Sequence, residues 1–378
     1  MRGILKMAEL LGGHSLAARI FEHIDNKTTD LGDACWSEPV KNYRSESRLE
    51  EELERGFRQR AIPFCPSVAL PEPGSYVARE AGGTPLLAIR GRDGNARVFR
   101  NACRHRGAQV ASGTGRQSAF ACRYHGWTYG LDGSLKTVPH EHGFPQIIKE
   151  KCGLVPVNAA EQGGFVFVTQ MPPEPVADLP DIPELLRDGL QLLTVNEQVI
   201  NANWKVLAES FIEGYHIRST HRDTFYPVQY DNLNVVEYFG RNSRVTYPFR
   251  NIEKLRNKVP TKAEMEGALT HVYHLFPNIM IATFPHRIVM VALEAVSVSK
   301  TRQTTYVMSD PQTLGQDPER EKQATDFVDA GNAEDREVVE SIQRGLKSGA
   351  NEFFEFGLFE GAIVHFHKNL QAILEGGE

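Results

Sequence analysis

The chain has 378 residues, of which 41% are hydrophobic, and a formal net charge of −6 at pH 7. This length and composition allow two globular domains, or one large core with an inserted module. The acidic balance argues against nucleic acid as the main partner, because phosphate binding requires clustered Lys and Arg. The sequence shows no apolar run of roughly 18 residues and no signal-peptide pattern, so we expect a cytoplasmic protein without a membrane partner.

The first elements predicted along the chain are helical and the following ones are strands. Residues 1–25 predict a short amphipathic helix, and the run SRLEEELERGF (47–57) predicts a helix that ends near Gly56 and has a solvated charged face. We assign residues 1–57 to an N-terminal helical segment that packs on the C-terminal domain. Residues 58–168 alternate β-like runs with Asp-Gly turns, which indicates a compact all-β domain.

The second half of the chain has a different composition and a different pattern of predicted elements. Five prolines between Pro172 and Pro183 predict an extended connector. Residues 267–309 predict long antiparallel strands, and helices are expected around 334–346 and 361–374. Strands followed by helices indicate an α+β domain, which we assign to residues 169–378.

The cysteines divide into two kinds. Cys35, Cys65 and Cys152 stand alone, and five cysteines in a chain of this length do not indicate a disulfide framework. The other two form mixed pairs, Cys103-x-His105 and Cys122-x-x-His125, with sixteen residues between the pairs. Such pairs allow a Cys2His2 zinc site, or a two-iron cluster in which one iron takes both cysteines and the other both histidines.

This spacing resembles the Rieske [2Fe–2S] pattern, and the flanking CRHRG and CRYHGW resemble those of Rieske oxygenases in particular. The resemblance implies that Cys103, His105, Cys122 and His125 hold one [2Fe–2S] cluster. The sequence lacks the additional cysteine pair that bridges the two loops in many cytochrome-complex Rieske proteins. Its absence favours the oxygenase or ferredoxin branch.

A second metal site is predicted in NWKVLAESFIEGYHIRSTH (203–221). Glu209, Glu213 and His216 stand at i, i+4 and i+7, which predicts one face of a continuous helix, and His221 follows five residues after His216. Two histidines and one carboxylate form the facial triad of non-haem Fe(II) oxygenases. The predicted carboxylate is Asp335. Two further predictions are that the neighbouring Glu334 is the alternative carboxylate and that Glu209 is a structural hydrogen-bonding partner.

The same stretch, with Asn203-Trp204-Lys205 and Glu213-Gly214-Tyr215-His216, resembles the catalytic signature of Rieske oxygenase terminal subunits. The resemblance implies that His216, His221 and Asp335 bind one mononuclear Fe(2+). It also implies that Glu213, where the family more often has Asp, is a catalytic bridge between an iron-ligand histidine and a cluster histidine of a neighbouring subunit. A head-to-tail homotrimer is therefore expected.

The resemblance further implies an all-β Rieske domain joined to a helix-grip catalytic domain. It predicts a terminal oxygenase that uses O2 and takes electrons from NAD(P)H through a reductase, with or without a ferredoxin. We predict hydroxylation or dihydroxylation of a small aromatic or apolar substrate. The alternatives are a monooxygenase or demethylase of a quaternary ammonium or methylamine compound, and an electron-transfer protein with an inactive second site. Whether a β subunit accompanies the chain stays open.

The sequence also offers candidates for the substrate pocket, although strand alternation does not reveal which face is inward. These candidates are Tyr273, Phe276, Asn278, Met280, Phe284 and His286. Arg218 and Arg222 flank the predicted iron histidines, and we assign them to a solvated face rather than to binding of a substrate carboxylate.

Overall fold

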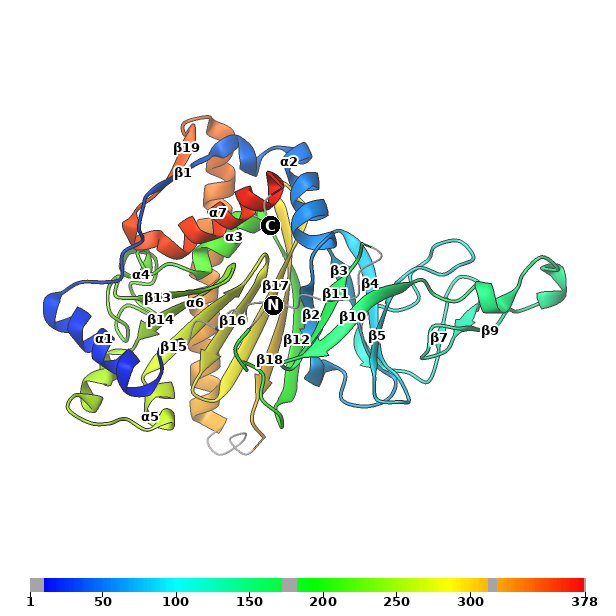
Figure 1. Ribbon diagram of the computed structural model, residues 1–378, viewed down its shortest axis with the longest axis horizontal. Helices are drawn as coiled ribbons and strands as arrows, with labels where there is room; N and C mark the ends of the chain where they lie inside the picture. Colours follow the sequence, from blue (N-terminus) through cyan, green and yellow to red (C-terminus); the bar gives the residue numbers. More distant parts are fainter. Residues whose placement is uncertain (1–9, 172–181, 312–317, 377–378) are drawn as a thin grey trace, which may run out of the picture. The chain divides into compact units, whose positions relative to one another are not determined.

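A computed structural model describes residues 10–171, 182–311 and 318–376, which form two compact units (Figure 1). One unit spans Leu53–Val195, and the other combines Met1–Glu52 with Asn196–Glu378. The predicted α+β class is confirmed, because an all-β sheet unit accompanies a unit in which helices join a seven-stranded antiparallel sheet. The domain boundaries drawn from the sequence stay predictions, and residues 172–181 of the proline-rich connector lie outside the described residues.

The Leu53–Val195 unit contains two antiparallel sheets. The larger sheet has the strand order β2-β11-β10-β5-β4-β3-β6, and the smaller has the order β7-β8-β9. The predicted turns at Gly94 and Gly133 connect neighbouring strands, and both glycines adopt positive φ angles, of 82° and 77°. The strands are β2 (Ile62–Pro66), β3 (Ser75–Ala81), β4 (Thr84–Arg90), β5 (Ala96–Arg100), β6 (Gly113–Arg116), β7 (Phe120–Ala121), β8 (Thr128–Tyr129), β9 (Leu135–Thr137), β10 (Pro156–Gln162) and β11 (Phe165–Thr169).

The other unit is organised around a sheet of order β12-β18-β17-β16-β15-β14-β13. The strands predicted over residues 267–309 are confirmed as four consecutive antiparallel strands of this sheet. Short strands β1 and β19 pair separately and join the N-terminal part of the unit to its C-terminal part. The strands are β1 (Trp36–Pro39), β12 (Gln191–Ile200), β13 (Val235–Phe239), β14 (Asn242–Pro248), β15 (Leu269–Leu275), β16 (Ile279–Phe284), β17 (Arg287–Ser297), β18 (Lys300–Ser309) and β19 (Phe353–Phe356).

The helices of this unit include the long α6, which contacts both α3 and α4, and α7, which contacts β13 and β14 (Figure 1). The C-terminal helix was predicted at the residues where α7 lies, whereas α6 begins well before the predicted residue 334. In the described residues, no helix is both long and apolar enough to cross a bilayer. The helices are α1 (Gly13–Asn26), α2 (Glu46–Glu51), α3 (Trp204–Phe211), α4 (Ile217–Thr220), α5 (Lys262–Glu266), α6 (Pro318–Gly345) and α7 (Gly361–Leu374).

The acidic run at residues 47–57 differs from its prediction in one respect. It forms α2 and then a π-helical turn over Glu52–Arg58, but its charged side chains are not all solvated. Glu52 is completely buried and lies 2.6 Å from the equally buried Lys205 Nζ. Trp204 Nε1 also donates to Glu52, at 3.0 Å. The charge is buried because a cation and an indole from α3 satisfy it, and burying a carboxylate requires such partners.

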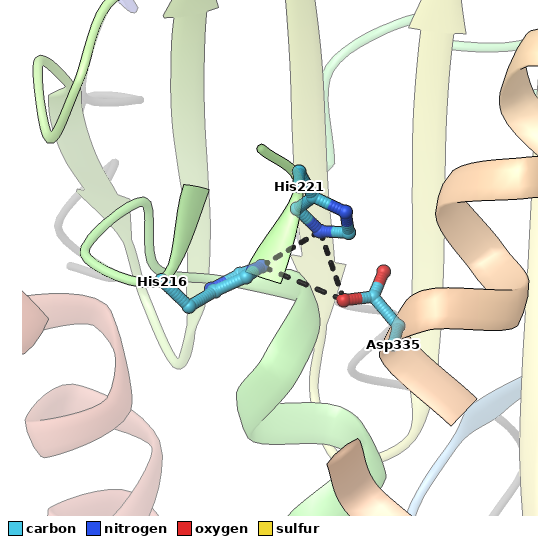
Figure 2. A group of neighbouring side chains, drawn as sticks. All are labelled: His216, His221 and Asp335. Atoms are coloured by element: carbon cyan, nitrogen blue, oxygen red, sulfur yellow. Dashed lines mark hydrogen bonds and ion pairs between the residues drawn. The ribbon is translucent and has the colours of Figure 1, made fainter. Parts of the chain in front are cut away.

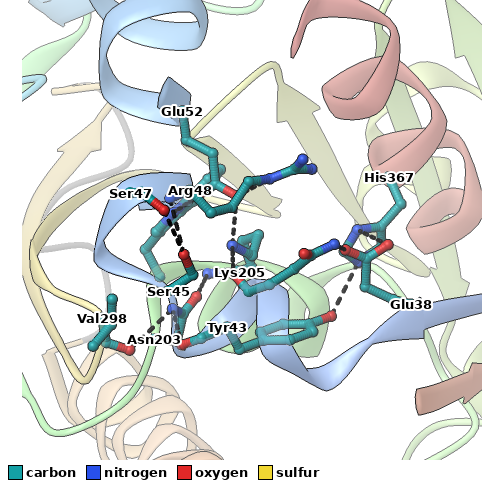
Figure 3. A network of polar contacts seen from close by, with 12 residues as sticks. Glu38, Tyr43, Ser45, Ser47, Arg48, Glu52, Asn203, Lys205, Val298 and His367 are labelled. Atoms are coloured by element: carbon teal, nitrogen blue, oxygen red, sulfur yellow. Dashed lines mark hydrogen bonds and ion pairs between the residues drawn. The ribbon is translucent and has the colours of Figure 1, made fainter. Parts of the chain in front are cut away.

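Figure 3 shows that this ion pair belongs to a larger buried network between residues 38–52 and helices α3 and α7. Tyr43 donates its hydroxyl to Glu209 Oε1 at 2.7 Å, and His367 Nε2 lies 2.9 Å from the same oxygen. Glu209 is therefore a hydrogen-bonding partner in the protein interior, as predicted. The network fixes α3, the helix that leads into the predicted iron-binding residues.

Candidate metal centres

The two Cys/His loops of the β unit have matching backbone geometry. The Gly107 N–H donates to the Cys103 carbonyl at 2.8 Å, and the Gly126 N–H donates to the Cys122 carbonyl at 2.9 Å. The φ angles of the two glycines are 78° and 74°, in the left-handed region that favours glycine. Each loop therefore turns tightly around its cysteine, in the same way, and presents the histidine that lies inside the turn.

The cysteines and histidines of these loops differ in exposure. Cys103 and Cys122 are each 3% exposed, and the Tyr129 hydroxyl lies 3.2 Å from Cys103 Sγ. Burial and the hydrogen bond with Cys103 raise the pKa of Tyr129 above its ordinary value, so this hydroxyl stays a proton donor. His105 is half-buried and His125 is exposed, with ring centroids 4.7 Å apart. The histidine side is thus the accessible side.

The donor types of these four residues fit a Rieske cluster. Two buried thiols and two more accessible imidazoles are the ligands that the two irons of such a cluster take, both thiolates on one iron and both imidazoles on the other. Another set of described His, Cys, Asp and Glu side chains has ligand atoms that all lie within 4.8 Å of one another, in the C-terminal part of the chain.

That convergent set is His216, His221 and Asp335, the three residues predicted to bind iron (Figure 2). His216 Nε2 and His221 Nε2 lie 3.2 Å apart. Asp335 Oδ1, from α6, lies 3.0 Å from His221 Nε2 and 3.5 Å from His216 Nε2. Two nitrogens and one oxygen on one side of a common point form the donor set of a facial triad.

The hydrogen bonds of the two Nδ1 atoms explain why the space between the two Nε2 atoms and Asp335 suits a cation. Glu213 hydrogen-bonds His216 Nδ1, and Glu334 Oε2 lies 2.8 Å from His221 Nδ1. A carboxylate only accepts, so both Nδ1 atoms carry the proton and both Nε2 atoms present lone pairs. Two lone pairs and the Asp335 oxygen then face each other, and a metal ion relieves their repulsion. The residues present therefore fit a mononuclear iron.

The helix predicted to run continuously through Glu209, Glu213 and His216 is interrupted in the structure. Helix α3 ends at Phe211, and His216 is the N-cap of the short α4, so Glu209, Glu213 and His216 do not share one helical face. The Glu213 carboxylate accepts hydrogen bonds from the N–H groups of Tyr215 and His216, so these groups are not available for α-helical hydrogen bonds. A Cβ at Gly214 would lie 2.3 Å from Asn234 Oδ1, so a larger residue in this turn would displace the buried Asn234 side chain.

His216 has a raised pKa. Burial lowers the pKa of the ring, but the hydrogen bond and charge of Glu213, with the charge of Asp335, outweigh burial. Glu334, the alternative iron carboxylate, contacts Nδ1 of His221 and lies outside the convergent set.

A cavity of about 640 Å³ opens beside His216, His221 and Asp335. One face of the sheet forms its wall, with Met280, Ala282 and Phe284 at alternate positions of β16. Of the six pocket candidates, Met280 and Phe284 line the cavity, whereas Tyr273, Phe276, Asn278 and His286 are not among its lining residues. Arg218 and Arg222 are exposed and do not line it, as expected for a solvated face.

Sequence reasoning missed several lining residues that come from other elements. Phe225 packs against His221 with ring centroids 4.6 Å apart, and against Phe327 of α6 at 5.1 Å. Tyr247 of β14 and Arg287 of β17 also line the cavity. These residues stand in no recognisable motif, and only the fold brings them to the triad.

The fold and the two centres define a class of protein, one with a Rieske-type β domain and a mononuclear iron-binding α+β domain. Family comparison agrees: residues 60–150 match the Rieske [2Fe-2S] domain, and residues 183–376 match the ring hydroxylating alpha subunit (catalytic domain). The chain belongs to the Rieske non-haem iron oxygenases, as a terminal oxygenase alpha subunit. It thus carries a Rieske [2Fe–2S] domain and a catalytic domain with a candidate His/His/Asp iron site.

The similar proteins include enzymes named for quaternary ammonium compounds. The carnitine monooxygenase oxygenase subunit of Acinetobacter pittii is 30% identical, covering 84% of this chain and 86% of its own length. The chloroplastic choline monooxygenase of Spinacia oleracea is 25% identical, covering 89% and 78%. The crystal structure of the quaternary ammonium Rieske monooxygenase CntA with L-carnitine superposes with a TM-score of 0.74 at 26% identity, covering 89% of this chain and 95% of that one.

Proposed function

We propose that this chain is the oxygenase component of a Rieske monooxygenase that acts on a small quaternary ammonium compound. The Rieske oxygenase class is established by the family, and the substrate class is the proposed part. The similarity over most of the chain to carnitine and choline monooxygenases supports it. This similarity favours the alternative drawn from the sequence over the hydroxylation of a neutral aromatic compound.

The cavity lining carries the proposal. Aromatic side chains attract a substrate cation through their ring faces, and carboxylates add a favourable field. Six aromatic side chains line this cavity: Phe211, Phe225, Tyr247, Phe249, Phe284 and Phe327. Glu197 and Asp329 line it as well, in addition to Glu213 and Asp335 at the triad. Against these four carboxylates the lining has one arginine, Arg287, so its balance of charge and its aromatic rings favour a compact cation with an apolar surface over a neutral ring.

We assign the cluster to Cys103, His105, Cys122 and His125, and the mononuclear iron to His216, His221 and Asp335. When bound, the iron activates O2 with electrons that arrive through the cluster. The chain's own residues hold the two histidine rings, exclude water with the apolar cavity wall and orient the substrate cation.

Glu213 is proposed as the catalytic bridge between subunits. Its carboxylate already holds His216 Nδ1, and the cluster histidines lie on the accessible side of their loops. In a head-to-tail homotrimer a cluster histidine of a second copy would meet Glu213. Electrons would enter from NAD(P)H through a reductase, with or without a ferredoxin.

Turnover with a surrogate reductase tests the substrate class. The purified protein is supplied with NADH and O2, and product is measured for L-carnitine, gamma-butyrobetaine and choline, and separately for neutral aromatic compounds such as biphenyl. We expect an oxidised product from at least one quaternary ammonium compound and none from the aromatic set. Oxidation of the aromatic compounds alone would refute the proposed substrate.

Iron content tests the competing class, an electron-transfer protein with an inactive second site. We expect about three iron atoms per chain, two in the cluster and one at the triad. About two iron atoms per chain, with an intact cluster spectrum and no turnover, would support the electron-transfer protein instead.

A further inference from the structure

Helix α6 presents two consecutive carboxylates to one histidine ring. Asp335 Oδ1 lies 3.0 Å from His221 Nε2, and Glu334 Oε2 lies 2.8 Å from His221 Nδ1. His221 itself is 1% exposed, whereas the side chains of Glu334 and Asp335 are 32% and 26% exposed, so the ring is enclosed and the two carboxylates lie at its edge. The two edges of the imidazole are therefore held by adjacent residues of the same helical turn.

We propose that Glu334 is a positioning residue that fixes His221 for metal binding and locks α6 to the loop that follows this histidine. The proposal rests on the iron site assigned above. It gives Glu334 a role distinct from that of Asp335, because Glu334 would hold the ligand and Asp335 would hold the metal.

Thr224 supplies the second contact that makes Glu334 a fixed acceptor. The Thr224 hydroxyl donates to Glu334 Oε2 at 2.6 Å, the same oxygen that faces His221 Nδ1. A carboxylate oxygen has two lone pairs and can accept both hydrogen bonds. Thr224 thus anchors the oxygen, and the oxygen fixes the tautomer and orientation of the ring.

The chemical effect follows from the protonation of the ring. With Nδ1–H donated to Glu334, the neutral ring carries its lone pair on Nε2, where a metal would bind, and the carboxylate makes the ring a stronger base toward that metal. Outer partners of this kind typically change metal affinity by about 10–100-fold.

Glu334 also differs from Glu213, the carboxylate on the other ligand histidine. Glu213 is three residues from His216 and belongs to the same turn, whereas Glu334 is 113 residues from His221 in the sequence. Glu213 can therefore orient its histidine before α6 is in place. The Glu334 contact forms only when α6 docks, so it assembles the triad from two separate segments.

Further packing supports this docking. Gly331 lies one turn before Glu334 on α6, and a Cβ at Gly331 would lie 2.2 Å from the Phe225 ring. Phe225 directly follows Thr224. The loop after His221 thus contacts α6 through a close ring approach and through the Glu334 hydrogen bonds, on positions i and i+3 of one helical face.

The test measures Fe(II) binding without any substrate. Protein that retains its cluster is depleted of mononuclear iron with a chelator and titrated anaerobically with Fe(II) against a chromophoric chelator. We expect Glu334→Ala to raise the Fe(II) dissociation constant about 10–100-fold, and Glu334→Gln and Thr224→Val to raise it less. The matched control is Glu337→Gln, an exposed carboxylate on the same helix, with unchanged affinity expected.

The outcomes separate the possible roles. Wild-type affinity in Glu334→Ala, with the cluster spectrum intact, overturns the proposal. Iron loss as complete as in Asp335→Ala also overturns it, because Glu334 would then be a ligand itself. If Glu334→Ala does not fold, Glu334→Gln and Thr224→Val decide by the same measurement. A wild-type protein that binds no Fe(II) beyond the cluster refutes the iron site, whereas failure of the substrate proposal leaves this titration unaffected.

Discussion

Replacing Gly331 by alanine tests whether the Phe225 wall of the cavity controls the reaction. A Cβ at Gly331 would lie 2.2, 2.5 and 2.9 Å from three atoms of the Phe225 ring, and an ordinary contact begins at 3.4 Å. The ring must therefore retreat by about 1.2 Å, since the helix backbone on the other side is fixed. The same ring packs against His221 and Phe327, so its movement disturbs both the triad and the cavity.

The expected effect on stability is small. Overpacking typically costs about 1–3 kcal/mol, whereas alanine in a helix is favoured over glycine by about 1 kcal/mol. We therefore expect Gly331→Ala to lose about 0–2 kcal/mol of unfolding free energy, measured by denaturant titration. The effect on activity is larger, because a displacement of about 1 Å near the reacting groups can cost on the order of 100-fold.

The assay compares kcat/KM and the yield of product per O2 consumed, each normalised to iron content. Gly345→Ala is the matched control, because Gly345 ends the same helix and a Cβ there meets nothing within 4 Å. We expect this control to retain full activity. If Gly331→Ala kept the wild-type kcat/KM and product yield, the reasoning that links the Phe225 position to catalysis would be wrong.

Three further changes probe the cluster, the subunit bridge and the buried network. Supplied with excess Fe(II), Glu213→Ala should keep about three iron atoms per chain yet lose product formation, and turnover at the native rate would contradict the bridge. His105→Cys should lower the reduction potential of the cluster on the order of hundreds of millivolts, because a thiolate adds negative charge; redox titration checks this, and an unchanged potential would contradict the assigned ligand. Lys205→Met should cost up to about 3 kcal/mol in denaturant titration because it removes the buried cation of Glu52, which then has Arg48 at 3.2 Å and the Trp204 indole as partners, and adding Glu52→Gln should recover part of that loss. A double variant as unstable as the single one would show that the charge of Glu52 is not the cause.

The sequence predicted the parts of the site whose residues are close along the chain. Cys103 with His105, Cys122 with His125, and His216 with His221 each fall within six residues, so their spacing alone carries information. Asp335 lies more than a hundred residues from His216 and His221, so it was predicted from its place on an expected helix together with the family resemblance rather than from spacing. The structure places its Oδ1 atom 3.0 Å from His221 Nε2 and 3.5 Å from His216 Nε2.

The errors in the sequence-based predictions come from side-chain contacts that override the local pattern. Helical periodicity continued past Phe211 in the sequence, but the Glu213 carboxylate captures backbone N–H groups and Asn234 packs against Gly214. Glu52 looked solvated because its cation, Lys205, lies far away in the sequence. Neither effect leaves a signature in the local pattern.

The discontinuity of the iron-site unit has a consequence for the order of biosynthesis. The residues of the Leu53–Val195 unit, which include all four cluster ligands, leave the ribosome before any of the iron histidines. The unit that flanks it in the sequence closes only after β19 has been made to pair with β1, by which point Asp335 has already been made. Domains generally fold as units in the order of synthesis. The cluster can therefore be inserted into a finished domain while the N-terminal segment is still unpaired, whereas the three candidate iron ligands are together in the chain only once Asp335 has been made.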